Sequence, residues 1–471
     1  MISVDRRSVL RSCLRGSVFL LALCPAWGKA SAQSAPADRP AQWKSDNVLL
    51  FLHRSASMAA PENTVPALEA AVRQGADGVE IDIRRTKDGY FVLYHDDWVL
   101  EDRGPGGKIE DMPLSEVLTL DVGKRFGPQW KGLRTPLLGD VLRFAKANEL
   151  LLFLDIKTAG TYEAVLKAVT DAGCLPLVRN VGGQVPKDVF RSPDARPFLR
   201  GWNYTDGGEE DPERILAAKA NIPSAGCGIM ADDARTWAKA LGRRPEKRPF
   251  VRFSASPSPV RPTVPSPLRR AEPTDRLLTL AETGETGAAR LAALWELGRR
   301  RDRSTVGRLE TLAARPYPEK DGPEHYEKFF LKIGAACALT RIGGAESRAA
   351  LRRLIASKAR YDRASAAFAL AAFADRADLP LLIELVRSDP RNDGLVREVV
   401  LGYAGRFGDD ALPIYDAALD ASGFAGKLAV FGLAHRGRAA ERLIRSRLAD
   451  PATPPTVRHR LGLALALLPA R

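Results

Sequence analysis

Between residues 46 and 250, short apolar runs alternate with stretches of helical period. The apolar runs are rich in β-branched and aromatic residues, which is typical of buried strands. We expect strands at 48–52, 78–83, 91–94, 151–156, 175–179, 198–204 and 228–231. Helical stretches between them lie at 65–74, 137–148, 162–172 and 234–241. Strands that alternate with helices predict parallel βα units and hence an α/β domain.

Beyond residue 274 the pattern changes to amphipathic helices alone. Ala- and Leu-rich helices, such as 335–345 and 366–377, end in turns that contain Gly or Asp, and a second amphipathic helix follows. The turns recur about every 30 residues, a period at which helix pairs stack into a solenoid and bury their apolar faces on one another. The pattern resembles the short bacterial HEAT-like repeats, and it covers 275–471.

Two further segments differ from both regions. Residues 254–274 carry six prolines among serines and arginines, which predicts a semi-rigid linker. Residues 1–32 contain the pair Arg6 and Arg7, then an apolar stretch and a small-residue site, which is the order of an export signal of the twin-arginine form. We therefore expect a signal peptide at 1–32, an α/β domain at 46–250, a linker at 254–274, helical repeats at 275–471, and a periplasmic or secreted protein.

The formal net charge of +14 is concentrated in the helical region, where 275–471 hold 32 basic and 24 acidic side chains. The simpler interpretation is a solvated helical surface. The alternative is that the repeats dock on a protein partner or an anionic surface, because basic surfaces attract polyanions. For an exported protein we do not expect nucleic acid as the partner. No apolar stretch reaches the ~20 residues that span a bilayer, so we expect no transmembrane segment.

Carboxylates lie on one face of the second expected strand. Glu80 and Asp82 are two residues apart, so their side chains point to the same side. Neighbouring carboxylates repel one another unless a cation lies between them, and such hard oxygen ligands suit Mg²⁺ or Ca²⁺. Asp155 offers a third carboxylate on another strand, with Lys157 two positions further on. The set predicts a site for one divalent cation, Ca²⁺ or Mg²⁺.

Two of the five histidines, His53 and His95, also fall at strand ends in this part of the chain, and Arg54 follows the first. Hydrolysis of a phosphate ester can use both histidines for proton transfer and the basic side chains for binding the phosphate. One histidine takes the proton of the nucleophile, and the other protonates the leaving alkoxide. Arg54 and Lys157 can neutralise charge on the phosphoryl oxygens. The pattern leaves open which histidine is the acid and which is the base.

The segment that carries these residues closely resembles the glycerophosphodiester phosphodiesterases. Its motifs are His-Arg, Pro-Glu-Asn-Thr, Gly-Ala-Asp, Glu-x-Asp, Thr-Lys-Asp-Gly and His-Asp, followed later by an acidic-x-Lys strand. The resemblance is convincing over 47–157 and extends more weakly to about 243. It implies a TIM-type (β/α) barrel, with catalytic residues at the carboxyl ends of the strands.

The resemblance also implies a role for each residue. His53 and His95 match the acid–base pair, Arg54 and Lys157 the substrate-binding positions, Glu80, Asp82 and Asp155 the metal ligands, and Glu62 and Asn63 residues that support them. Two positions depart from the family. Ser55 stands where the family has glycine, and Asp155 stands where glutamate is more usual.

These features predict an exported, metal-dependent phosphodiesterase that hydrolyses glycerophosphodiesters to glycerol 3-phosphate and an alcohol. Its partner would be a small-molecule or lipid-derived phosphodiester. Two alternatives stay open from the sequence. One is a lysophospholipase-D-like activity on a lipid phosphodiester. The other is a catalytically inactive barrel in a HEAT-repeat binding or scaffold protein, since a fold alone does not confer function.

Overall fold

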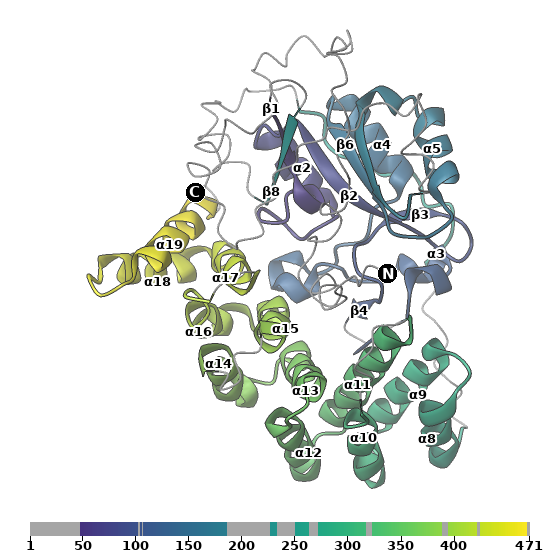
Figure 1. Cartoon of the computed structure of the whole chain (residues 1–471), viewed down its shortest axis with the longest axis vertical. Helices are drawn as coiled ribbons and strands as arrows, with labels where there is room; N and C mark the ends of the chain where they lie inside the picture. The colour runs from purple at the N-terminus through teal and green to yellow at the C-terminus, as the bar shows by residue number, and fades with distance from the viewer. Residues whose placement is uncertain are drawn as a thin grey trace, which may run out of the picture.

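A computed structural model describes residues 48–101, 104–105, 107–185, 227–232, 250–262, 272–316, 323–388, 394–421 and 424–468. The expected signal peptide, the expected strand at 198–204 and the expected helix at 234–241 lie outside these residues. Figure 1 shows a sheet with its helices in the upper part of the view and a curved row of further helices below it.

A parallel sheet organises the N-terminal region. Its five parallel strands run in the order β7-β6-β2-β1-β8, and β3 joins β2 in the antiparallel sense. The strands are β1 Val48–Leu52, β2 Gly78–Arg85, β3 Phe91–Leu93, β6 Leu151–Ile156, β7 Val178–Gly183 and β8 Cys227–Ala231. This half-barrel of parallel strands agrees with the expected (β/α) barrel, whereas closure of the barrel stays a prediction.

The two faces of the sheet differ because successive side chains on a strand point to opposite sides. Leu50, Ile81 and Leu154 lie on one face and are fully buried. They share a core with helices α2 (Val65–Arg73), α4 (Leu138–Ala147) and α5 (Tyr162–Asp171). The alternate positions on the same strands, Glu80 and Asp155, therefore lie on the opposite face, away from these helices. This alternation places the charged side chains inside the half-barrel.

The chain between β3 and α4, residues 94–137, forms a small connecting lobe. It contains β4 Leu100–Glu101, β5 Gly104–Pro105, η3 Ile109–Asp111, α3 Leu114–Val117, η4 Lys124–Phe126 and η5 Pro128–Trp130. The lobe has a hydrophobic cluster that includes Ile109, Leu114 and Val117. Val92 of β3 belongs to the same cluster, so the lobe packs against the sheet.

From residue 274 onward the described chain is helical. The helices are α8 Thr274–Thr283, α9 Gly287–Arg300, α10 Val306–Ala313, α11 Pro323–Ile342, α12 Gly344–Ala356, α13 Arg360–Phe373, α14 Leu379–Ser388, α15 Gly394–Ala404, α16 Leu412–Asp416, α17 Phe424–Ala434, α18 Gly437–Ala449 and α19 Pro455–Leu467. Short 3-10 turns lie between some of them, at η9 Arg303–Thr305, η10 Arg376–Asp378 and η11 Gly405–Ala411. Helices α9, α11, α13, α15, α17 and α19 pack one against the next, and the even-numbered helices pair with them. One hydrophobic cluster runs through the whole row. The all-helical prediction is confirmed, whereas the HEAT-like identity of the pairs stays a prediction.

Aromatic contacts join the helical region to the connecting lobe. Trp98 of the lobe stacks on Phe330 of α11 with ring centroids 4.9 Å apart. Phe126 meets Phe431 of α17 edge-on at 5.4 Å. Such aromatic pairs contribute about 0.5–1.5 kcal/mol each beyond the area that they bury. The row of helices thus contacts the lobe at two separated points.

Backbone groups approach closely at the same interface. Arg436 donates hydrogen bonds to the carbonyl oxygens of Phe126 at 3.4 Å and Gly405 at 3.0 Å. A Cβ atom added to Gly405 would lie 2.5 Å from the carbonyl oxygen of Arg125, a distance that side chains do not adopt. The glycine is therefore required by the close approach of η11 to the lobe.

One expected strand is misplaced. The structure has a 3-10 turn at Leu175–Leu177, and β7 runs over Val178–Gly183 rather than 175–179. Pro176 cannot donate a hydrogen bond to a neighbouring strand, which favours the turn. The expected strands at 48–52 and 151–156 are confirmed with the same bounds. Among the helices of the described ranges, none is long and apolar enough to cross a membrane.

Candidate active site

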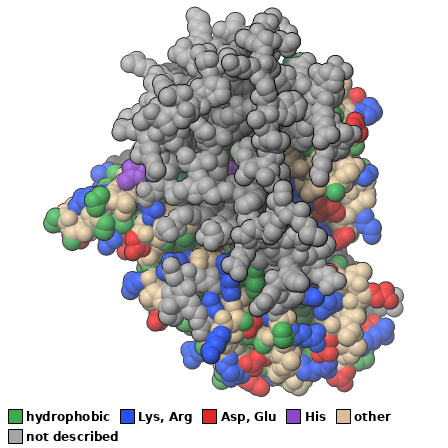
Figure 2. Space-filling view, viewed as in Figure 1, with side chains coloured by type: hydrophobic (Ala, Val, Ile, Leu, Met, Phe, Trp, Pro, Cys, Tyr) green, Lys and Arg blue, Asp and Glu red, His purple; other side chains and the backbone are tan. Residues whose placement is uncertain are grey.

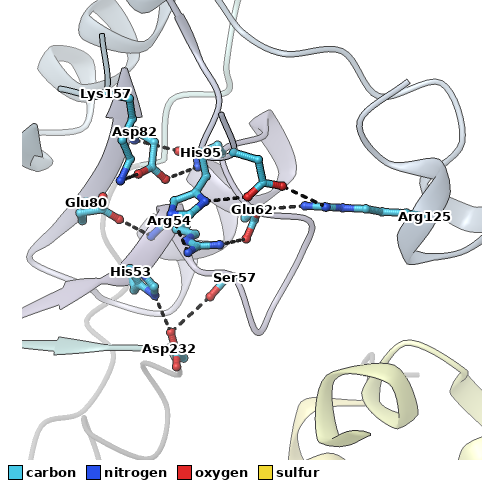
Figure 3. A network of polar contacts seen from close by, with 12 residues as sticks. His53, Arg54, Ser57, Glu62, Glu80, Asp82, His95, Arg125, Lys157 and Asp232 are labelled. Carbon is cyan, nitrogen blue, oxygen red and sulfur yellow. Dashed lines mark hydrogen bonds and ion pairs between the residues drawn. The ribbon is translucent and has the colours of Figure 1, made fainter. Parts of the chain in front are cut away.

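The residues singled out from the sequence gather at the carboxyl ends of β1, β2 and β6 (Figure 3). β1 ends at Leu52, so His53 and Arg54 enter the following turn. Asp82 and Asp155 are register partners on β2 and β6, which brings their side chains together. Ligands of α/β sheets bind at this edge, because the carboxyl ends of parallel strands meet there.

Three carboxylates form a tight cluster. Glu80, Asp82 and Asp155 each offer an oxygen atom, and these three atoms lie within 4.8 Å of one another. Glu80 is 2 % and Asp82 1 % exposed. Burial, followed by repulsion from Asp82 and Asp155, raises the pKa of Glu80 well above its usual range. Such a cluster gains stability from any cation that enters it.

Lys157 supplies one such cation. Its Nζ lies 2.7 Å from Asp155 Oδ2 and 3.0 Å from Asp82 Oδ1. Burial alone would raise the pKa of Asp82, but Lys157, His95 and Arg54 together with a hydrogen bond from Asn63 lower it below its usual range. One ammonium therefore balances one of the carboxylates, and the cluster keeps excess negative charge.

The oxygen atoms of the cluster fit a divalent cation. Asp155 Oδ1 is buried and accepts no hydrogen bond from the described residues, while the buried Asp82 Oδ1 has the ammonium of Lys157 at 3.0 Å. Buried polar atoms without a partner are rare in folded proteins and point to an ion or water. Carboxylate oxygens are the ligands that Ca²⁺ and Mg²⁺ prefer. Glu80, Asp82 and Asp155 are thus able to hold the predicted ion.

Arg54 connects three parts of the site. Its backbone N–H donates to Glu80 Oε2 at 2.7 Å, and its guanidinium donates to Glu62 Oε2 at 2.7 Å. A second guanidinium nitrogen lies 2.8 Å from His95 Nε2. Asn63, next to Glu62, donates to Asp82 Oδ2 at 2.6 Å. The supporting role expected of Glu62 and Asn63 is therefore compatible with their contacts.

The tautomer of His95 follows from its neighbours. A guanidinium can only donate, so Nε2 of His95 must accept from Arg54. Nδ1 then carries the hydrogen and donates to Asp96 Oδ1 at 2.8 Å. Burial and the positive charge of Arg54 lower the pKa of His95, so the ring is neutral at pH 7.

His53 is held from the opposite side, by Asp232. Its Nδ1 lies 2.9 Å from Asp232 Oδ1, and Ser57 Oγ donates to the same oxygen at 3.4 Å. Asp232 comes directly after β8, which is the neighbour of β1 in the sheet. Figure 3 shows Asp232 on the side of His53 that faces away from Glu80. Each histidine thus has its own carboxylate partner at Nδ1.

The connecting lobe adds Arg125 to the site. One guanidinium nitrogen donates to Glu62 Oε1 at 2.8 Å, and the other lies 3.5 Å from Asp96 Oδ2. These three residues line a small cavity beside His95. Arg125 therefore closes the polar network on the side of the lobe, as Figure 3 shows.

The turn after β1 has an unusual backbone. Arg54, Ser55 and Ala56 have φ angles of 48°, 65° and 78° in succession. This left-handed region favours glycine, because a side chain there crowds the following carbonyl group. Ser55 is the position at which the resembled family has glycine. The side-chain oxygen of Ser55 is buried and accepts or donates no hydrogen bond among the described residues.

Five residues of the network were not predicted: Ser57, Asp96, Arg125, Asp232 and Lys427, the last of which donates to Asp232 Oδ2 at 2.9 Å. Asp232 follows an expected strand directly, so the strand-end argument that identified His53 could have identified it too. Asp96 follows His95 within the quoted motif. Arg125 lies in a short 3-10 turn, where no pattern marks it. Lys427 is the one charged residue of the apolar helix Phe424–Ala434, a signal that could have marked it.

Comparison with known proteins supports the assignment of this region. Residues 53–194 match the model of the "Glycerophosphoryl diester phosphodiesterase family". A glycerophosphodiester phosphodiesterase of Caldanaerobacter subterraneus subsp. tengcongensis is 35% identical over 128 residues, which are 26% of this chain and 53% of the relative. Glycerophosphodiester phosphodiesterase 1 of Rattus norvegicus is 32% identical over 162 residues, 33% of this chain and 47% of the relative.

A solved structure is also similar. The glycerophosphodiester phosphodiesterase from Agrobacterium tumefaciens str. C58 matches 41% of this chain and 99% of its own, with 21% identity and a TM-score of 0.34. The chain spans about half the length of the curated relatives described above. Residues 53–194, which contain all the predicted site residues, thus match a domain of the glycerophosphoryl diester phosphodiesterase family.

Proposed function

We propose that this protein is a metal-dependent phosphodiesterase that hydrolyses glycerophosphodiesters to glycerol 3-phosphate and an alcohol. One observation carries the proposal. Two histidines, each with a carboxylate at Nδ1, lie at the same sheet edge as three clustered carboxylates, an arginine and a lysine. Similarity to the curated phosphodiesterases over the same residues supports the substrate class.

In this proposal the two histidines transfer the protons. The incoming hydroxyl group, from water or from the glycerol of the substrate, gives its proton to one histidine as its oxygen bonds to phosphorus. The other histidine protonates the alkoxide that leaves when the second phosphorus–oxygen bond breaks. The carboxylate at each Nδ1 orients the ring and stabilises its protonated form.

The cationic side chains act on the phosphate group. Arg54 and Lys157 neutralise charge on the phosphoryl oxygens, which is greatest in the transition state. Glu62 holds the guanidinium of Arg54 at 2.7 Å and so fixes its direction. A divalent cation held by Glu80, Asp82 and Asp155 would neutralise further phosphate charge and polarise a bound hydroxyl group.

The direct test is hydrolysis of glycerophosphocholine by the mature full-length protein, with Ca²⁺, Mg²⁺ or EDTA. We expect turnover with a divalent cation and none in EDTA. His53→Ala should abolish turnover, because general acid–base catalysis contributes about 10²–10⁴-fold. His459→Ala is the matched control, since His459 is exposed on α19. Folded protein that shows no turnover with any metal would contradict the proposal.

We also propose that the protein is exported by the twin-arginine route. The order of residues 1–32 supports this. Replacing both Arg6 and Arg7 by lysine should leave the protein in the cytoplasm, as measured by cell fractionation with an antibody against the mature chain. Periplasmic or secreted protein in equal amount from the doubly substituted chain would contradict the twin-arginine assignment.

For the helical region we propose HEAT-like repeats that dock on an anionic partner or surface. The successive packing of helix pairs and the excess of basic side chains over 275–471 support this. Figure 2 shows Lys and Arg side chains over these helices, with acidic ones interspersed. Binding to anionic vesicles should weaken from 50 mM to 500 mM salt, because salt screens exposed charges. Binding that is insensitive to salt would contradict the proposal.

A further inference from the structure

A lysine of the helical region reaches the candidate active site. Lys427 lies in the first turn of α17, and its Nζ donates to Asp232 Oδ2 at 2.9 Å. The two residues are 195 positions apart in the chain. The other oxygen of the same carboxylate is the one that faces His53 Nδ1 at 2.9 Å. Lys427, Asp232 and His53 therefore form a continuous line of contacts from the helices to the sheet.

Asp232 needs a counter-ion at this place. It is 8 % exposed, and a buried carboxylate without a positive partner loses several kcal/mol or takes up a proton. Burial alone would raise the pKa of Asp232, but Lys427 and His53 lower it below its usual range. Lys427 thus supplies positive charge that favours the ionised form of this carboxylate.

An ionised Asp232 determines the state of His53. The carboxylate accepts a hydrogen bond, so Nδ1 of the neutral ring carries the hydrogen and Nε2 carries the lone pair. We propose that Lys427 is a positioning residue of the active site, which holds Asp232 in place and through it fixes the ring of His53. This inference rests on the proposed phosphodiesterase function, and it makes the helical region part of the catalytic unit.

The docking of α17 does not depend on Lys427 alone. Phe431, on the same helix, packs on Phe126 of the lobe at 5.4 Å, and Arg436 donates to the carbonyl oxygen of Phe126. Gln129 donates to the carbonyl oxygen of His435 at 2.9 Å. These contacts keep the helix on the lobe when the ion pair is removed. A loss of turnover in a Lys427 variant therefore reports on Asp232 and His53.

The variants are Lys427→Met, Lys427→Arg, Asp232→Asn and the double variant K427M/D232N, all in the full chain. Lys332→Met is the matched control. Lys332 forms a buried ion pair with Asp362 at 2.6 Å, but that pair joins two helices, α11 and α13, and has no contact with the site residues described above. The two lysine-to-methionine changes thus remove similar ion pairs in different places.

We expect K427M to lower kcat for glycerophosphocholine about tenfold or more, with KM changed less than about twofold, because a partner behind a catalytic histidine affects the chemical step. K427R, which keeps the charge, should restore most of the activity. D232N should lose at least as much as K427M, and the double variant should equal D232N. K332M should lower the unfolding temperature and leave kcat unchanged. A K427M enzyme with normal kcat, or one that loses more than D232N, would overturn the inference.

A second readout does not depend on turnover. Nitrogen-15 NMR of histidine-labelled protein reports which ring nitrogen carries the hydrogen, and the chain has only five histidines. The His53 resonance, assigned by its loss in His53→Ala, should show hydrogen on Nδ1 in the unsubstituted protein and in K332M. In K427M the Nδ1–H form should decrease. If the unsubstituted protein hydrolyses no diester, the proposed function fails, while this spectrum still tests the contact. An unchanged His53 signal in K427M would overturn the inference.

Discussion

In the parallel sheet, buried charges gather at one edge, whereas in the helical region they are spread along the row of helices and held by ion pairs or backbone carbonyl groups. Glu80, Asp82 and Asp155 offer oxygen atoms within 4.8 Å of one another, and no second cluster of metal-ligand type occurs among the described residues. In the helices, Lys332 and Asp362 form an isolated buried ion pair at 2.6 Å. Both regions bury large apolar cores. Burial of charge therefore has different consequences in the two places.

The clustered charges of the sheet edge point to a function, whereas the isolated ion pair of the helices contributes to the stability of the fold. An isolated buried pair needs one partner of each sign, and breaking it destabilises the fold. Clustered like charges oppose folding, so they persist where a ligand or a reaction needs them. The sheet edge stores this unfavourable electrostatic energy in one cluster, and no second cluster of this type occurs among the described helices.

The sharpest test compares the same substitution in both regions. Asp82→Asn removes a charge from the cluster, and Asp362→Asn removes one from the isolated pair; both residues are buried. We expect D82N to reduce phosphodiesterase turnover at least about 1000-fold, which corresponds to roughly 4 kcal/mol of transition-state stabilisation. D362N should keep its turnover and lose roughly 3 kcal/mol of stability, because Lys332 is left without its partner.

Thermal unfolding with and without Ca²⁺ or Mg²⁺ completes this comparison. The metal should raise the unfolding temperature of the unsubstituted protein and of D362N, because a ligand stabilises the state that binds it. It should have no effect on D82N. Equal losses of turnover in D82N and D362N would contradict the separation of a functional cluster in the sheet from a stabilising pair in the helices.

A second comparison concerns the contact between the regions. Gly405→Ala places a methyl group 2.5 Å from the carbonyl oxygen of Arg125, so η11 and the lobe must move apart. We expect a loss of about 2 kcal/mol, the usual effect of overpacking. Gly402→Ala, on the neighbouring α15, adds its methyl group where no atom lies within 4 Å. The control should be neutral or stabilising by about 0.5–1 kcal/mol. Urea unfolding of both variants measures the difference, and equal stabilities would contradict the close approach.

His435, which follows α17, differs from the ion pairs of the helices because its own charge changes between pH 4 and pH 7. It packs against Trp130 and Phe431, and burial with the nearby Arg436 lowers its pKa to about 4 from 6.5. Between these values the unfolded chain binds more protons than the folded one, so the free energy of unfolding falls as pH decreases. From pH 7 to pH 5 the loss should be roughly 1–2 kcal/mol.

The measurement is the unfolding temperature at pH 7 and pH 5. His435→Gln, which does not titrate, should show a smaller decrease than the unsubstituted protein. His459→Gln serves as the control, because its exposed side chain lies on α19. An equal decrease in all three proteins would show that His435 is not the group responsible.

The smallest expected effect concerns backbone strain. At the sheet edge three consecutive non-glycine residues have positive φ, whereas in the described helical region Arg301 and Ala374 do so singly, each at the end of a helix. Ser55→Gly should stabilise the protein by about 1 kcal/mol, since glycine adopts this conformation without crowding. Ala374→Gly should give a smaller gain. A Ser55→Gly protein with a lower free energy of unfolding than the unsubstituted protein would contradict backbone strain at Ser55.

The sequence predicts the sheet edge well because the signals are local there. An apolar run that ends in His53 and Arg54, or that alternates with Glu80 and Asp82, specifies both a strand and the face on which its charges lie. Register across strands follows from parallel pairing, as Asp82 and Asp155 show. The misplaced strand at 175–179 has a similar cause. Its apolar residues suggested a strand, but the paired segment contains Gly182 and Gly183, which a pattern of apolar residues overlooks.

Contacts between distant elements leave no such signal. Arg125 meets Glu62 because the lobe folds back over the strand ends, and Lys427 meets Asp232 because α17 lies beside the sheet. Arg125 lies in a short 3-10 turn beside another basic residue, Lys124, whereas Lys427 is the one charged residue of the apolar helix α17. The lone lysine in an apolar helix marks Lys427 as unusual, but only the three-dimensional packing identifies Asp232 as its partner.

The distance of Lys427 along the chain has a consequence for folding. Asp232 precedes it by 195 residues, so the contact requires the closure of a long loop, which costs chain entropy. A partly folded chain can therefore contain both histidines and all three clustered carboxylates before Asp232 contacts Lys427. On our proposal, full turnover begins only when α17 has docked, so enzyme activity reports on the integrity of the entire chain.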